Sequence, residues 1–159
     1  MTRRNPKIAL LLSILDEAYE KKAWHGPNLK GSLRGVTPAG AAFRPARGRH
    51  SIRELTLHAA YWKYAVWRRL TGVQRGSFPL DGSNWFPRPG VPSPQEWKRE
   101  RALLEAQHRK LRSAVAALRS RPPRSLERQI YGVAAHDLYH TGQIQMLKRL
   151  HGTHRSQLK

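Results

Sequence analysis

Residues 131–150 read YGVAAHDLYHTGQIQMLKRL, and their apolar side chains recur every three or four positions, which is the period of one helix face. Residues 51–70, SIRELTLHAAYWKYAVWRRL, show the same pattern. Histidines stand where a helical bundle would otherwise carry Leu or Ile: His136 and His140 in the first segment, His58 in the second. If the two helices face each other, the three imidazoles converge on one point.

Capping signals set the bounds of the helix that carries His58. Residues 51–54, Ser-Ile-Arg-Glu, form a capping box, and Thr71-Gly72 predicts the stop. The last helix should run from about Tyr131 to Leu150 and end at Gly152.

Two more amphipathic segments complete a set of four. Asn5-Pro6 predicts a first helix that reaches about Trp24. A second capping box at residues 93–96 opens a third helix that ends near Leu118, before the RPPR stretch. A shorter helical segment is expected after Thr37-Pro38.

Four long amphipathic segments without an alternating strand pattern predict an all-α fold, a four-helix bundle. The long connections after the first and second helices indicate crossovers rather than a simple up-and-down path. We expect a single domain over residues 1–159, with its core at about 6–151 and a short flexible C-terminal tail.

The composition bears on partners. Thirty Lys and Arg against ten Asp and Glu give a net charge of +20, which would attract nucleic acid. The basic residues are dispersed, however, and no RRM, KH or zinc-finger signature accompanies them. We interpret the charge as a solvated arginine-rich surface. The second hypothesis is a basic nucleic-acid or stress-associated binding protein with a structural metal and no catalysis.

The N-terminal stretch resembles a signal peptide, because two arginines precede the apolar run IALLLSIL at residues 8–15. That run is short, and it continues into DEAYEKK without a small-residue cleavage site. We expect a mature helix there. No stretch approaches the roughly 20 apolar residues of a membrane span, so we expect no membrane association and a cytoplasmic protein.

Spacing on the last helix supports a metal site. His136 and His140 differ by about 40° in azimuth and by one turn in height, so both rings can reach one ion. Without partners, buried imidazoles would destabilise the fold. The alternative is a pair hydrogen-bonded to tyrosines or backbone. The chain has no cysteine, so any metal site must use His and carboxylates.

Other polar residues near these segments allow two interpretations each. His58 alone could be a structural core histidine or a ligand. Glu54 could orient His58, although completing the capping box is the favoured interpretation. His25 and His108 could line a pocket, although packed or solvent-facing roles are favoured. Asp137 should point about 100° away from its neighbour His136, out of the metal pocket.

The two long segments, in the order SIRELTLHAAYWKYAVWRRL and AAHDLYHTGQIQMLKRL, resemble the DinB/YfiT-like superfamily, and AWHGPNL and GVTPAGAAFRP fit the same pattern. The resemblance covers nearly the whole chain. It implies a four-helix bundle with a divalent transition metal, commonly zinc or nickel, bound by His58, His136 and His140. The family includes transferases and isomerases that use low-molecular-weight thiols, a proposed metal-dependent hydrolase, and members with no known activity.

The chemistry that fits is Lewis-acid activation of a bound water or an exogenous low-molecular-weight thiol, as in a metal-dependent transferase or hydrolase. A thiol cosubstrate suits a chain that has no cysteine. Gln143, Tyr61, Trp62 and His25 are candidate pocket residues for a small-molecule substrate. Non-specific nucleic-acid binding and a homodimer both stay open.

Overall fold

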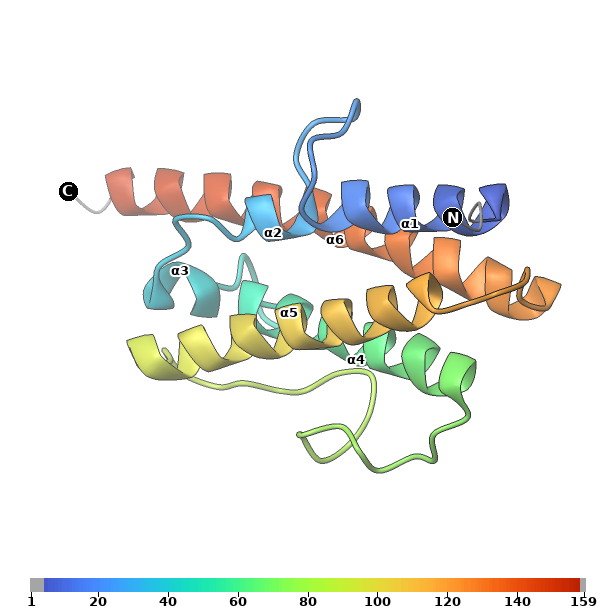
Figure 1. The fold of residues 1–159 in the computed structure, drawn as a ribbon. Coiled ribbons are helices and arrows are strands. Elements are labelled where there is room, and N and C mark those ends of the chain that lie inside the picture. The colour runs from blue at the N-terminus through green and yellow to red at the C-terminus, as the bar shows by residue number, and fades with distance from the viewer. Residues whose placement is uncertain (1–4, 158–159) are drawn as a thin grey trace.

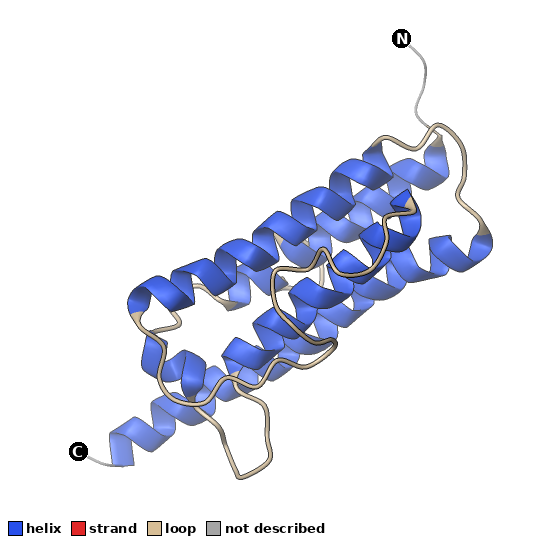
Figure 2. Cartoon of the chain, turned by 90° about the horizontal axis from the view of Figure 1, so that it is seen from below, coloured by secondary structure: helices blue, strands red, loops and turns tan. Residues whose placement is uncertain are grey.

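The computed structural model describes residues 5–157. Residues 1–4 and 158–159 lie outside the described residues, and the last two belong to the expected C-terminal tail. Within residues 5–157 the chain forms six helices and no strand (Figure 2). The four long helices are α1 (Pro6–Tyr19), α4 (Ile52–Thr71), α5 (Pro94–Ala116) and α6 (Arg124–Gln157). Two short helices, α2 (Leu29–Ser32) and α3 (Pro38–Ala42), lie in the connection between α1 and α4. The predicted all-α bundle is confirmed.

The long helices are arranged with two parallel pairs. On α4 and α5, Arg53 pairs with Glu100 and Lys63 contacts His108, so these consecutive helices run in the same direction. Figure 1 shows α1 and α6 running the opposite way. Each of α4 and α1 packs against both α5 and α6. Residues 72–93 must therefore cross back along the bundle, which confirms the crossover predicted after the second long helix. The crossover predicted after the first is absent, because α1 and α4 run in opposite directions and their connection joins neighbouring ends.

The first helix is shorter than expected. It ends at Tyr19 rather than near Trp24, because the chain folds back onto the last turn. The Lys21 amide donates to the Asp16 carbonyl at 2.8 Å, and the Lys21 ammonium pairs with the Asp16 carboxylate, also at 2.8 Å. A tight turn at Gly26, whose φ of +98° favours glycine, then leads toward α2.

The last helix is longer than expected at both ends. It begins at Arg124, about two turns before Tyr131, because the Pro123 carbonyl accepts from the amides of the first turn. At the other end the helix continues through Gly152 to Gln157. A glycine inside a helix costs only about 1 kcal/mol, so Gly152 alone does not end it.

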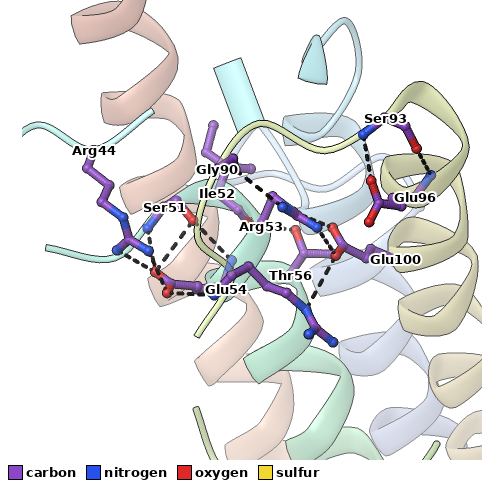
Figure 3. Close-up of polar contacts among 11 residues, drawn as sticks. Arg44, Ser51, Ile52, Arg53, Glu54, Thr56, Gly90, Ser93, Glu96 and Glu100 are labelled. Carbon is purple, nitrogen blue, oxygen red and sulfur yellow. Dashed lines mark hydrogen bonds and ion pairs between the residues drawn. The ribbon is translucent and has the colours of Figure 1, made fainter. Parts of the chain in front are cut away.

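The bounds of α4 agree with the prediction. Both hydrogen bonds of the Ser51 and Glu54 capping box are present, and Gly72 ends the helix with a φ of +74°. Glu54 also accepts two hydrogen bonds from the Arg44 guanidinium, each 2.7 Å long (Figure 3). The carboxylate of Glu54 therefore anchors the start of α4, as the favoured interpretation held.

The end of the crossover is fixed to the bundle by the same group of polar contacts (Figure 3). Arg53 donates two hydrogen bonds to Glu100, 2.9 and 2.6 Å long, and a third to the Gly90 carbonyl at 3.4 Å. The Arg88 amide donates to Glu54 at 3.3 Å. These bonds hold residues 88–90 over the first turns of α4.

The buried apolar side chains form two clusters along the bundle. On α6 the first cluster includes Ile144 and Leu147, and the second includes Ile130 and Val133. The buried polar side chains include His58 and Lys63 of α4, His108 of α5, and Asp137 and His140 of α6. On α6, the last two stand between Val133 of the second cluster and Ile144 of the first. Among the described helices, none is long and apolar enough to cross a membrane.

Candidate metal centre

Three histidine rings meet where α4 and α6 face each other. His58 Nε2 lies 3.0 Å from His136 Nε2, which in turn lies 3.0 Å from His140 Nε2. In the described part of the chain, these three residues form a group whose ligand atoms all lie within 4.8 Å of one another. The predicted convergence of the imidazoles is therefore present, on adjacent turns of α6 and one turn of α4.

Hydrogen bonds to the outer nitrogens determine the tautomers of two rings. His58 Nδ1 lies 2.8 Å from the Asn84 carbonyl oxygen, which can only accept, so this nitrogen carries the proton. His140 Nδ1 lies 2.6 Å from Gln143 Oε1, and the Gln143 amide donates to Tyr139 at 3.3 Å. The Nε2 lone pairs of both rings therefore point inward.

His136 lies between these two lone pairs and can donate to only one of them. Its Nδ1 is buried and has no hydrogen-bond partner among the described residues. A cation resolves this mismatch. Two nitrogens that each lie 2.0–2.1 Å from one ion are separated by about 2.9–3.4 Å, which matches the 3.0 Å spacings. The donor set fits a divalent transition metal.

Burial keeps these imidazoles neutral at pH 7. Loss of hydration is the main cause that lowers the pKa of His58 to about 4 and that of His136 to about 3, and the neighbouring histidines contribute to both shifts. The pKa of His140 is lowered by the same desolvation. Neutral imidazole is the form that binds a metal, so the rings need not lose protons to do so.

The crossover segment covers the cluster on one side. Trp85 stacks on the His58 ring, with centroids 3.8 Å apart, and its other face stacks on His50 at 3.6 Å. Asn84 has a φ of +64°, an uncommon conformation for a residue with a side chain. It turns its carbonyl to His58 and accepts from the Trp62 indole at 3.0 Å. Sequence reasoning missed Asn84 and Trp85; their only signal was an Asn-Trp pair in the aromatic connection.

A buried ion pair lies beside the cluster. Lys63 and Asp137 are both 0% exposed, and the Lys63 ammonium donates to the Asp137 carboxylate. Burial raises the pKa of Asp137 to about 6, although the Lys63 charge opposes the rise. The ammonium also lies 3.4 Å from Nδ1 of His108, which stacks on Tyr19. Asp137 thus points away from the three rings, as expected, and His108 is packed in the core.

Of the four candidate pocket residues, two lie at the histidine cluster and two lie away from it. Trp62 lies edge-on to His58 and His136, with centroids 6.4 Å away in each case, and Gln143 contacts His140 directly. Tyr61 instead packs against aromatic rings of the crossover segment. His25 is exposed in the loop between α1 and α2, which projects from the α1 side of the bundle (Figure 1).

The model of the DinB superfamily matches residues 23–144, well over half of the chain, and this stretch contains His58, His136 and His140. No curated protein sequence and no solved structure matches the chain.

Proposed function

Because the chain belongs to the DinB superfamily, we propose that it binds one zinc or nickel ion through His58, His136 and His140 and is a metal-dependent transferase. Its cosubstrate would be an exogenous low-molecular-weight thiol; with water in that role the same site would be a hydrolase. The observation that carries the proposal is the convergence of three neutral imidazoles, two of which are hydrogen-bonded so that their Nε2 lone pairs point inward.

A divalent ion held by these three neutral imidazoles would supply Lewis-acid chemistry, which makes a thiol or water nucleophilic near pH 7. The remaining tasks fall to the chain. Asn84 and Gln143 orient two of the ligand rings through their outer nitrogens, and Trp85 covers one face of His58. Because the chain contains no cysteine, a reacting thiol must come from outside.

The test is a turnover assay with a panel of low-molecular-weight thiols and electrophiles, in the presence and absence of zinc or nickel. We expect turnover that requires the metal, that His58→Ala abolishes, and that His25→Ala leaves unchanged. His25 is the matched control because it is an exposed histidine outside the cluster. Turnover that persists without metal, or in the His58→Ala protein, would contradict the proposal.

The net charge of +20 favours a second candidate function, a basic nucleic-acid or stress-associated binding protein in which the metal is structural. It differs from the first in that binding would not depend on an open coordination position. A salt titration of DNA binding separates the two.

A further inference from the structure

A cavity of about 550 Å³ opens between α4 and α6, and His136 is one of its lining residues. Its floor is apolar and comes from both helices: Trp62 and Val66 on α4, Gly132 and Val133 on α6. The Trp62 ring is held in place by its hydrogen bond to the crossover segment. The cavity therefore leads from the solvent to an edge of the histidine cluster along a preformed apolar surface.

The far end of the cavity is positively charged. Arg69 of α4 and Arg128 of α6 line it, both exposed, and no Asp or Glu is among its lining residues within the described chain. One amino group of Arg69 donates to Gln129 at 2.8 Å, which orients the guanidinium and leaves its other N–H groups available. This end is complementary to an anionic group.

Helix geometry gives the length of the ligand. Arg128 and His136 lie about two turns apart on α6, a rise of about 12 Å, and Trp62 and Arg69 are separated by about 10 Å on α4. A ligand with its anionic group at the arginines therefore needs an apolar body of up to about 10 Å to reach the histidine cluster.

We propose that this cavity binds the substrate and that the substrate is an organic acid with an apolar body, whose carboxylate pairs with Arg69 and Arg128. That this acid is a substrate rests on the proposed function. Its binding does not depend on that function, because none of the contacts involves a metal.

Octanoate is the probe, with octanamide as its uncharged counterpart, and binding to the metal-free protein is measured by calorimetry. Arg69→Gln and Arg128→Gln should each weaken octanoate binding about two- to fivefold, as expected for exposed ion pairs. Arg149→Gln, an exposed arginine on the same helix but outside the cavity, should leave it unchanged. Equal binding of octanoate and octanamide, or an equal loss in Arg149→Gln, would overturn the proposal.

Gly132 offers a way to fill the cavity. A Cβ at this position meets no atom within 4 Å, and the same holds for Gly142 on the exposed side of α6. Gly132→Leu should reduce octanoate binding at least tenfold, whereas Gly142→Leu should not, with both proteins folded by circular dichroism. Unchanged binding in Gly132→Leu would overturn the assignment.

Light scattering tests the alternative occupant, a second copy of the chain. A dimer that Gly132→Leu converts to a monomer, together with no octanoate binding by the wild type, would overturn the proposal in favour of an interface. The proposed function fails separately: octanoate binding without any metal-dependent turnover rejects the transferase alone, and turnover without octanoate binding rejects the cavity alone.

Discussion

The packing of α4 against α6 depends on the ion pair between Lys63 and Asp137. Both are fully buried, and the loss of hydration is offset by their mutual hydrogen bond. The second carboxylate oxygen of Asp137 has no partner among the described residues. Because His136 precedes Asp137 in the chain, the ion pair also fixes the turn of α6 that carries the central ring of the cluster.

Replacing Lys63 by methionine should destabilise the protein by about 3–5 kcal/mol, because Asp137 would stay buried without its counter-charge. The double variant Lys63→Met/Asp137→Leu should recover most of the loss, since both charges are then absent. Urea unfolding of the metal-free proteins measures both. A cost below about 1 kcal/mol for Lys63→Met would show that the pair does not matter for stability.

The lowered histidine pKa values predict acid sensitivity. In the unfolded chain a histidine takes up a proton near pH 6.5, whereas in the folded protein His58 and His136 do so only near pH 4 and 3. The contribution of these neutral histidines to stability is therefore complete above about pH 6.5 and is lost as the pH drops toward these values. Each histidine contributes a slope of about 1.4 kcal/mol per pH unit.

Urea unfolding of the metal-free protein at pH 7.5, 6 and 5 measures this slope. His108→Phe should reduce it by the share of one histidine, because burial also lowers the pKa of His108, to about 2. A free energy of unfolding that stays constant between pH 7.5 and 5 would mean that the buried rings are not neutral.

Among the elements, the crossover at residues 72–93 contributes most to the site after α4 and α6. It provides the carbonyl that orients His58 and the indole that covers it. Polar bonds to Arg53 and Glu54 of α4 and the ion pair of Arg88 with Glu100 of α5 hold its end in place. Removing the cover should loosen the His58 ring without unfolding a helix.

Trp85→Ala should therefore weaken metal binding by about three- to tenfold, the worth of one aromatic stacking contact. Competition with a coloured chelator measures the affinity. Trp24→Ala is the matched control, because the Trp24 side chain is 100% exposed. An equal effect of both substitutions would show that the stacking on His58 does not support the ligand.

The sequence predicted those features that depend on contacts between residues close together in the chain. The start of α4 was predicted correctly because its capping bonds join residues three apart. The three histidines were found because helical spacing and the family resemblance both pointed to them. The bond of His58 to Asn84 spans 26 residues, and that of Lys63 to Asp137 spans 74. No periodicity encodes such pairs, so the cover and the ion pair were missed.

At the scale of the whole molecule, the charge of +20 is the dominant property. The lysines and arginines are spread over helices and loops, so their contacts with phosphate groups would be dispersed and independent of the DNA sequence. We expect DNA binding that is weak, indifferent to His58→Ala, and largely lost at high salt. Fluorescence anisotropy with labelled duplexes at two salt concentrations measures it. Tight binding that survives high salt would favour the nucleic-acid-binding function.

The central claim is that His58, His136 and His140 hold one metal ion, and calorimetric titration of the metal-free protein with zinc or nickel tests it most directly. We predict one ion per chain for the wild type and for His25→Ala, and an affinity at least about 100-fold lower for His136→Ala with its helical circular dichroism retained. A wild type that binds no ion, or a His136→Ala protein that binds one as tightly, would contradict the claim.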